Sequence, residues 1–140
     1  MRLHIVARGK IGQSPEADLV ARYMKRINWE TKISELPDEG GKTPKLDGQT
    51  MTIALDEKGD NWTSAKFASL LGRWRDDGVR EARFLIGAAD GLNDEERNSA
   101  DVFFSFGKAT WPHMMVRAML AEQLFRASAI LSGHPYHREG

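Results

Sequence analysis

Short apolar runs and amphipathic stretches alternate along the whole chain. Runs such as LHIVA and ARFLI predict β-strands at residues 3–7, 31–36, 50–55, 82–86 and 101–106. Between these runs the apolar residues recur at three- and four-residue spacing, which predicts helices. Alternating strands and helices are typical of an α/β protein with a mostly parallel sheet and flanking helices. The sequence has no internal repeat, so residues 1–140 are expected to form a single domain.

The starts of three predicted helices carry recognisable signals. Ser14 followed by Pro15 resembles an N-cap residue with proline at the first helical position. Thr63 or Ser64 is suited to cap the second helix. The acidic residues 94–96 match the positive end of a helix dipole. These signals predict where each helix begins.

Two polar stretches interrupt the pattern. DEKGDN, residues 56–61, is predicted to be a turn after the third strand. PDEGGKTPKLDG, residues 37–48, is rich in turn-forming residues. It is therefore the best candidate for a mobile loop.

The last predicted helix, from about His113 to Ser132, has two different apolar faces. One is a continuous stripe expected to face the core, made of Val116, Leu120, Leu124, Ala127 and Leu131. The other mixes large apolar side chains with charged and polar ones, namely Met115, Met119, Ile130, Glu122, Gln123 and Arg126. Such a mixture is more typical of a protein interface than of a solvated surface, so it predicts a homodimer. The alternative is that the methionines cover neighbouring loops.

Composition narrows the class of protein. The 140 residues are 41% hydrophobic and 29% charged, as in ordinary globular domains. The chain contains no cysteine, which excludes disulfides and thiolate metal sites. Its apolar runs are too short for a signal peptide or a membrane span, so the expected location is the cytoplasm, with no membrane partner.

The charge balance argues against tight binding of bare nucleic acid. Twenty basic residues balance twenty acidic ones, and residues 1–45 hold only a small excess of nine Lys/Arg over six Asp/Glu. Affinity for nucleic acid comes largely from neutralised phosphates. A basic patch in the N-terminal part is permitted by these numbers but not required.

Three predicted loops follow strand ends, after Leu55, after Ile86 and after Phe106. In a parallel sheet such ends meet at one edge, where ligands commonly bind. Gly87 would let backbone approach a ligand closely, although glycines such as Gly87 and Gly91 more often serve as simple turn residues. The chain lacks the G-x-G-x-x-G fingerprint, so dinucleotide binding has little support.

The C-terminal tail HPYHREG concentrates reactive side chains. His134 and His137 suggest a zinc site, but zinc takes three or four ligands and only His4 and His113 remain as further histidines. Pro135 also prevents a regular helix that would present the pair on one face. No G-x-S-x-G motif supports a serine nucleophile. A metal is therefore not expected, and the tail would otherwise pack on its own domain or on a partner.

The motifs LIGAADGL, ATWPHMMVRAMLAEQLFRA and HPYHRE, in this order, make the sequence resemble the ribosomal RNA large subunit methyltransferase H family of the SPOUT class. The resemblance covers nearly the whole chain. It implies transfer of a methyl group from S-adenosylmethionine to N3 of a pseudouridine in 23S rRNA, at the subunit interface of the assembled ribosome. It also implies a homodimer and a C-terminal trefoil knot that holds the cofactor.

The resemblance also assigns residues to the cofactor. Backbone groups of three loops would hold the adenine and ribose, through Leu55, Gly87, Ala88, Gly107, Lys108, Ala109, Thr110, Trp111 and Pro112. The family usually has two adjacent glycines where this chain has Gly87 and Ala88, so the contact at Ala88 departs from the pattern.

Catalytic roles follow from the same resemblance. The N3 proton belongs to a weakly acidic imide, and His137, or else His134, would accept it. Tyr136 would stack on the target base or its neighbour. Arg138 would hold a phosphate or an anionic pyrimidine oxygen, and Glu122 would orient a tail residue or the base. The sequence does not decide which histidine is the base or whether both protomers act at once.

Two other classes of function remain open at this point. A non-catalytic ribosome-binding module would keep the fold without binding cofactor. A metal-dependent hydrolase would use the paired tail histidines. Cofactor binding and metal analysis separate these two from a methyltransferase.

Overall fold

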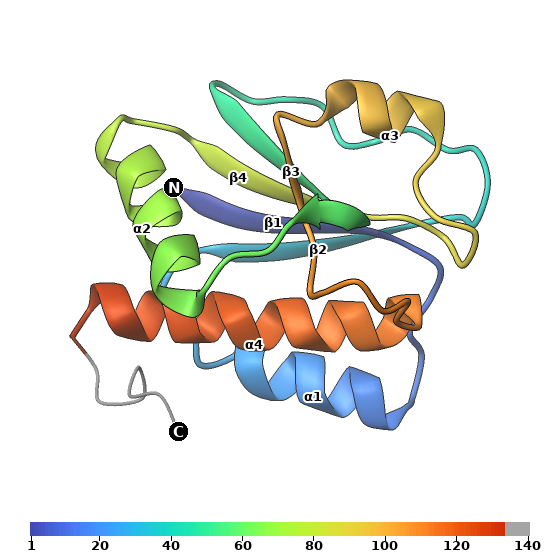
Figure 1. Cartoon of the computed structure of the whole chain (residues 1–140), viewed down its shortest axis with the longest axis horizontal. Helices are drawn as coiled ribbons and strands as arrows, with labels where there is room; N and C mark the ends of the chain where they lie inside the picture. Colours follow the sequence, from blue (N-terminus) through green and yellow to red (C-terminus); the bar gives the residue numbers. More distant parts are fainter. Residues whose placement is uncertain (134–140) are drawn as a thin grey trace.

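The computed structural model describes residues 1–133, which form one α/β sandwich (Figure 1). The strands in this part of the chain are β1 (Arg2–Arg8), β2 (Thr31–Leu36), β3 (Thr50–Asp60), β4 (Glu81–Ile86) and β5 (Val102–Phe104). The helices are α1 (Pro15–Met24), α2 (Ser64–Asp76), α3 (Asp94–Ser99) and α4 (His113–Leu131). The predicted fold class is confirmed, whereas the trefoil knot stays a prediction.

All pairings in the five-stranded sheet are parallel, in the order β2-β1-β4-β3-β5. Leu3 of β1 lies opposite Thr31 of β2 and Ala82 of β4, and Leu55 of β3 lies opposite Phe104 of β5. The carboxyl ends of all five strands therefore meet at one edge of the sheet. The loops that follow β3, β4 and β5 are neighbours there.

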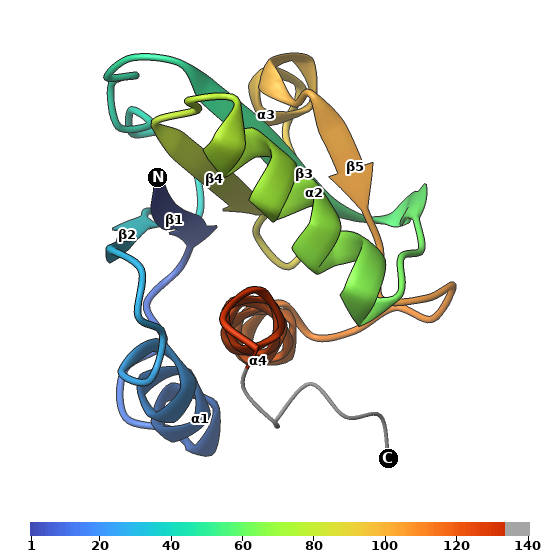
Figure 2. The ribbon, with the colours of Figure 1, turned by 90° about the vertical axis from the view of Figure 1, so that its left-hand side faces the viewer.

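Helices α1, α4 and α2 cover one face of the sheet, and α3 lies on the other (Figure 2). The main core lies under the three helices, where alternate strand residues such as Ile5, Ile53 and Phe84 are fully buried. We call this side the helix face. The main core is rich in aromatic rings, with Phe67 at 5.3 Å from Phe104 and 6.1 Å from Phe84 between ring centroids.

The opposite side, the loop face, is polar although it is equally buried. Its apolar cluster contains only Val6, Ala54 and Leu85 as buried members. Around this cluster lie ionisable residues at most 5% exposed, namely His4, Arg8, Glu81, Arg83 and Glu96. The segment 37–48 and α3 cover these charges.

Buried arginines bind the segment 37–48 by its backbone. Arg8 donates to the carbonyls of Pro37 and Gly40, and Arg83 donates to the carbonyl of Pro44 at 2.7 Å. Each arginine also has a buried glutamate, Glu96 at 3.2 Å from Arg8 and Glu81 at 2.7 Å from Arg83. The predicted mobile loop is thus tied down at several points, a feature that its composition alone does not indicate.

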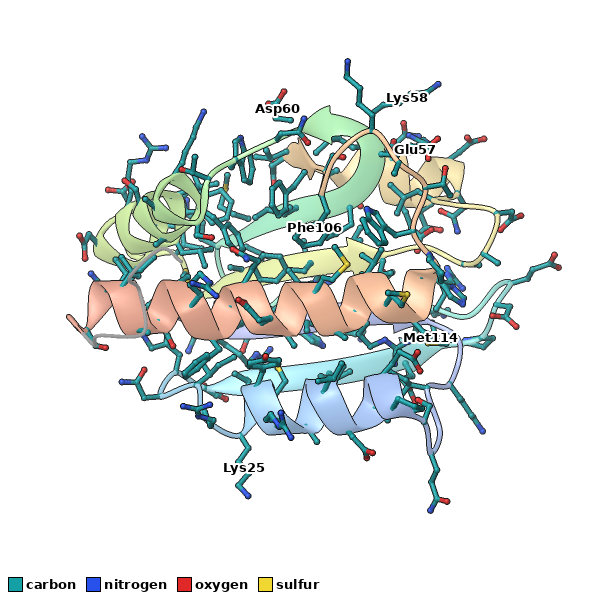
Figure 3. The ribbon with its side chains drawn as sticks, turned by 60° about the horizontal axis from the view of Figure 1, so that its bottom comes forward. Lys25, Glu57, Lys58, Asp60, Phe106 and Met114 are labelled. Atoms are coloured by element: carbon teal, nitrogen blue, oxygen red, sulfur yellow. The ribbon has the colours of Figure 1, made fainter. Side chains whose placement is uncertain are left out.

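Helix α4 lies between α1 and α2 and is buried on more than one side. Of the predicted core stripe, Leu120, Leu124 and Ala127 are at most 1% exposed, while Val116 and Leu131 are half-buried. The mixed face is more exposed, with Met115 at 39% and the other five residues half-buried. In Figure 3 this helix runs across the front of the molecule, with Met114 at the end nearest the strand carboxyl ends.

The predicted helix starts are confirmed. Ser14 accepts a hydrogen bond from the Ala17 N–H with Pro15 in the first turn, and Thr63 caps α2. The acidic first turn of α3 is also present. It includes a capping box that the sequence analysis did not predict, in which Asn93 and Glu96 exchange hydrogen bonds of 2.7 and 2.9 Å.

The prediction of a polar turn at residues 56–61 was wrong, because β3 continues to Asp60. The extension is held by β5, since Asp60 lies opposite Phe104 and its carbonyl accepts a 2.9 Å hydrogen bond from the Ser105 N–H. At Gly59 a Cβ atom would lie 2.7 Å from the Phe103 backbone, so only glycine allows this approach. Strand pairing and a glycine contact override the polar composition here. β5 in turn is shorter than the predicted 101–106.

Candidate functional site

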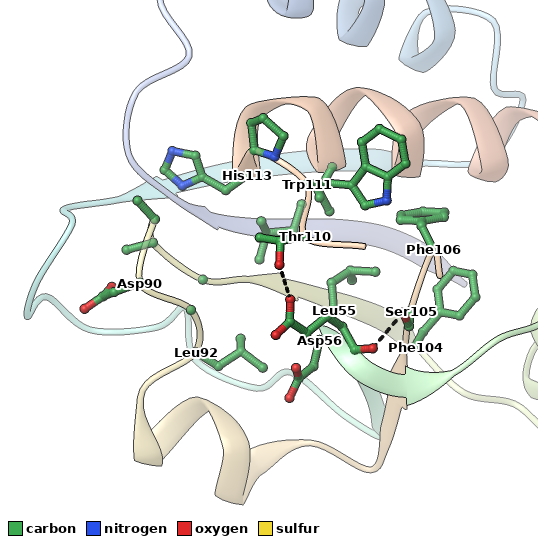
Figure 4. Close-up of a pocket in the computed structure, with 18 of the residues that line it drawn as sticks. Leu55, Asp56, Asp90, Leu92, Phe104, Ser105, Phe106, Thr110, Trp111 and His113 are labelled. Atoms are coloured by element: carbon green, nitrogen blue, oxygen red, sulfur yellow. Dashed lines mark hydrogen bonds between the residues drawn. The ribbon is translucent and has the colours of Figure 1, made fainter. Parts of the chain in front are cut away.

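A pocket of about 740 Å³ opens at the carboxyl ends of β3, β4 and β5 (Figure 4). Its walls come from residues 55–57, 86–92, 104–107 and 109–113, together with Arg97 and Val116. The volume is within the range of small-molecule and cofactor sites. The three loops singled out by the sequence therefore form one cavity.

Eight of the nine residues assigned to a cofactor line this pocket, and these are Leu55, Gly87, Ala88, Gly107, Ala109, Thr110, Trp111 and Pro112. Lys108 is exposed and does not line it. Trp111 is 40% exposed at the pocket wall, which is unusual for so large an aromatic side chain.

Gly87 is required by the chain's own turn. A Cβ at this position would lie 2.5 Å from the carbonyl carbon of Gly91, so no side chain fits. The turn is closed by the Gly91 N–H, which donates to the Ala88 carbonyl at 2.8 Å, and Gly91 has a φ of 97°. The glycine at 87 thus allows a tight fold-back of backbone. Ala88 follows it and lines the pocket.

The third loop is held from both ends. The buried hydroxyl of Ser105 accepts from the Gly107 N–H at 3.1 Å and contacts the Gly107 carbonyl at 2.6 Å. Farther along, the Thr110 hydroxyl donates to the Glu57 carboxylate at 2.7 Å, seen as a dashed line in Figure 4. The extension of β3 beyond residue 55 therefore places an acidic side chain where it fixes this loop.

Acidic groups outnumber basic ones in the pocket. Asp56, Glu57 and Asp90 line it, against Arg97 as the lining arginine. Burial of Asp56 works to raise its pKa, but the 2.6 Å hydrogen bond from Arg97 and the Lys58 N–H outweigh burial, so the pKa of Asp56 is lowered. The pocket therefore carries negative charge at neutral pH, which favours a positively charged ligand.

A second pocket, of about 450 Å³, shares a wall with the first. Its lining comes from four segments: Gly9–Lys10, Asp38–Glu39, Ala88–Asp90 and His113–Met114. Residues 88–90 and His113 belong to both pockets. In Figure 4, His113 and Asp90 lie at one end of the first pocket, and Phe104 and Phe106 lie at the other.

His113 is the site residue that the sequence analysis missed. It was considered there only as a spare zinc ligand. Its Nδ1 atom is buried and has no hydrogen-bond partner among the residues described. The sequence could have indicated His113 by its position, because this residue directly follows the segment 107–112 that was assigned to the cofactor.

The catalytic candidates of the tail, His134, Tyr136, His137 and Arg138, lie outside the described residues. Glu122 lies in the middle of α4, where its carboxylate accepts from Arg126 at 2.8 Å. It does not line either pocket. Within residues 1–133 no group of three or more potential metal ligands was found, and no helix there is long and apolar enough to cross a membrane.

Comparisons with known proteins agree with this geometry. A family model described as a predicted SPOUT methyltransferase matches residues 1–137. A "Ribosomal RNA large subunit methyltransferase H" of Rhizorhabdus wittichii is 66% identical over the full length of both chains. The protein of the same name from Zymomonas mobilis is 61% identical, again with full coverage of both.

Two solved structures share the fold at low identity. A probable methylase family protein from Haemophilus influenzae has a TM-score of 0.62 at 11% identity, covering 99% of this chain and 70% of its own. A probable methyltransferase from Bordetella pertussis has a TM-score of 0.61 at 14% identity, with coverage of 91% and 94%.

Proposed function

The chain belongs to the SPOUT methyltransferase family, and on that premise we propose that it transfers a methyl group from S-adenosylmethionine to N3 of a pseudouridine in 23S rRNA. The observation that carries this proposal is the 66% identity, over both full lengths, to a protein named as a large-subunit rRNA methyltransferase. The pocket at the ends of β3, β4 and β5 supports it independently, because it combines the three loops assigned to the cofactor.

The residues of the first pocket fit S-adenosylmethionine. The molecule carries a positive sulfonium, and the pocket has three carboxylates against one arginine in its wall. The adenine needs apolar surface, which Leu55, Ile86 and Phe106 provide. Backbone groups of the loops 87–91 and 107–112 would hold the ribose and adenine edges. Lys108 does not line the pocket, so we assign its side chain no contact with the cofactor.

S-adenosylmethionine supplies an activated methyl group, so the protein's own task is to orient the base and to take its N3 proton. We assign proton removal to His137 or His134. Tyr136 would stack on an unpaired base, and Arg138 would neutralise a phosphate or the anionic oxygen of the base. Glu122 would act only indirectly, because its carboxylate lies along α4 in an ion pair with Arg126.

A homodimer completes this proposal. The half-exposed mixed face of α4 is the surface that we assign to the second copy, with Met115 as its most exposed apolar residue. The tail of one protomer would then work beside the cofactor pocket of its partner. The C-terminal knot and the location in the cytoplasm belong to the same proposal.

The substrate would be the assembled ribosome. With a formal net charge of zero, the chain has little electrostatic attraction for bare RNA, so recognition would depend on the shape of the ribosome. Filter binding of the isolated hairpin and of whole ribosomes compares the two. Equally tight binding to both would contradict this part of the proposal.

Mass spectrometry of rRNA tests the central claim. A strain that lacks this gene should have 23S rRNA with one methyl group missing from one pseudouridine, and purified protein with S-adenosylmethionine should restore it. Removal of residues 134–140 should abolish methylation while cofactor affinity, measured by calorimetry, changes little. Loss of cofactor binding in the shortened protein would make the tail a structural element instead.

A further inference from the structure

We propose that the second pocket receives the target base and that His113, in the wall between the two pockets, contacts the imide edge of that base. The inference rests on the proposed function and extends it by naming the subsite of the nucleotide. No part of it depends on the tail.

Position is the first argument. A methyl group in the first pocket must reach N3 of the base, so the base has to occupy a space that opens directly into that pocket. The second pocket meets this condition, because Ala88, Ala89, Asp90 and His113 line both. Its 450 Å³ is large enough for a nucleoside by the usual scale of small-ligand sites.

The second argument is that buried arginines hold two of its walls. Arg117, 1% exposed, donates to the Gly9 carbonyl at 3.1 Å and pairs with Glu35 at 2.5 Å. Glu35 in turn accepts from the Ile11 N–H at 2.9 Å, so the loop carrying Lys10 is fixed on both sides. Arg8 holds the other wall through the carbonyls of Pro37 and Gly40, which flank Asp38 and Glu39.

Buried arginines of this kind are costly to place, because each guanidinium must be removed from water. Here each arginine pairs with a glutamate and also donates to loop backbone at the rim of a cavity. A preformed cavity lowers the cost of ordering a ligand site when the ligand binds. The arrangement therefore suits a binding pocket better than a chance gap between loops.

The third argument is the chemistry of the walls. The side chain of His113 lines both pockets, and its Nδ1 atom is buried with no hydrogen-bond partner among the described residues. A neutral imidazole nitrogen either accepts from an N–H or donates to a carbonyl, and the imide edge of a pyrimidine presents both groups side by side. Asp38 and Asp90 add acceptors, which match pseudouridine because its ring has a second free N–H. Lys10 is the cation of this wall.

Substitutions at His113 test the contact directly. The side-chain amide of asparagine occupies nearly the position of Nδ1, whereas alanine leaves nothing there. We expect His113→Ala to lower the single-turnover methylation rate on ribosomes about 100-fold, the scale of a base held about 1 Å out of its reactive position. His113→Asn should recover at least tenfold of that loss. The dissociation constant for S-adenosylmethionine, measured by calorimetry, should stay within about twofold in both variants.

Lys10 provides a second variant that does not depend on α4. Its side chain is exposed, lines only the second pocket and makes no ion pair within residues 1–133, so Lys10→Ala will fold. We expect a several-fold higher KM for ribosomes with unchanged cofactor affinity. Lys66→Ala is the matched control, because Lys66 is exposed on α2 and lines neither pocket. Its kinetics should equal those of the unmodified protein.

The outcomes are separable. If the unmodified protein methylates ribosomes and His113→Ala stays within threefold of its rate, the inference is wrong and the proposed function stands. A loss of cofactor affinity that matches the loss of rate would place His113 in the cofactor site alone and also overturn it. If light scattering shows that the Lys10→Ala variant has become a monomer, the second pocket belongs to the dimer interface, and this result also overturns the inference. If the unmodified protein itself is inactive on ribosomes, the proposed function fails first.

Discussion

The two faces of the sheet are equally buried but built from opposite chemistry. On the helix face, aromatic and aliphatic side chains such as Phe67, Phe84 and Leu71 pack in one continuous core. On the loop face, an apolar cluster with three buried members is surrounded by buried ions. Burial of apolar area stabilises folds directly, whereas a buried ion pair often contributes little net stability.

This difference separates two tasks. The helix face holds the molecule together. The loop face positions the segment 37–48, which contributes Asp38 and Glu39 to the second pocket. It does so through Arg8 and Arg83, which bind backbone carbonyls of that segment. The first pocket lies at the strand ends, where both faces contribute residues. Four substitutions test this division.

The largest expected effect is on the helix face. Phe67 is 1% exposed and its ring contacts Trp62, Phe84 and Phe104. Phe67→Ala should lower the free energy of unfolding by about 4 kcal/mol, because it removes buried apolar area and leaves a cavity. Urea denaturation measures this. The control is Leu46→Ala, at a side chain 66% exposed, where a change above about 0.5 kcal/mol would be surprising.

On the loop face, Glu81 is the residue whose loss should matter most. Its carboxylate accepts from Arg2 at 2.9 Å and from Arg83 at 2.7 Å, and lies 3.2 Å from His4. Glu81→Gln should cost about 3 kcal/mol, since it leaves the buried Arg83 without a counter-charge. Combining it with Arg83→Met should recover most of this loss. If the double variant is no more stable than Glu81→Gln alone, the ion pairs themselves hold this face together.

The third prediction concerns pH. Burial lowers the pKa of His4 from its usual 6.5, against the opposing influence of Glu81. On acidification below about pH 6.5 the unfolded chain therefore takes up a proton that the folded chain does not, and stability falls. The slope from this group cannot exceed about 1.4 kcal/mol per pH unit. His4→Asn should flatten the stability profile between pH 6.5 and 5.

A second fall should follow at lower pH, in both proteins. Burial works to raise the pKa of Glu81, but hydrogen bonds from Arg2 and Arg83 outweigh it and lower the pKa below the usual 4.5. The stability that Glu81 contributes is present above pH 4.5 and is lost as the pH falls through its lowered pKa. Identical profiles for both proteins above pH 5 would contradict the role given to His4.

The smallest expected effect lies where the faces meet, at the exposed hydrogen bond between Thr110 and Glu57. Thr110→Val keeps the shape and removes the donor. We expect S-adenosylmethionine to bind about threefold more weakly, corresponding to about 0.7 kcal/mol, with stability nearly unchanged. Thr110→Ser is the control that retains the hydroxyl. Equal affinity in the valine variant would mean that the loop is positioned by Ser105 alone.

Periodicity and capping residues predicted most of the fold. Strand alternation and the signals at Ser14 and Thr63 are local, so a single sequence carries them. The exception, residues 56–61, depends on pairing with β5, which lies more than forty positions away. A polar composition cannot reveal a partner strand.

Only part of the candidate site could be predicted from the sequence. Position after strand ends identified the loops at Leu55, Gly87 and Gly107, because parallel strands bring such ends together. The second pocket was not foreseen. It depends on Arg117 and Arg8, two buried cations that hold the loops through backbone carbonyls. Every residue has a backbone carbonyl, so the sequence does not show which ones accept these hydrogen bonds. The roles of the tail residues stay predictions.

The parallel order of the sheet also governs when this protein becomes competent during its own synthesis. The first pocket is formed by the ends of β3, β4 and β5 and by the first turn of α4. Helix α4 in turn packs against both α1 and α2. Parallel strands cannot pair through a short hairpin, so each contact awaits a distant segment. A nascent chain therefore cannot complete the first pocket until α4 has left the exit tunnel. We expect affinity for S-adenosylmethionine to arise in one late step, rather than strand by strand.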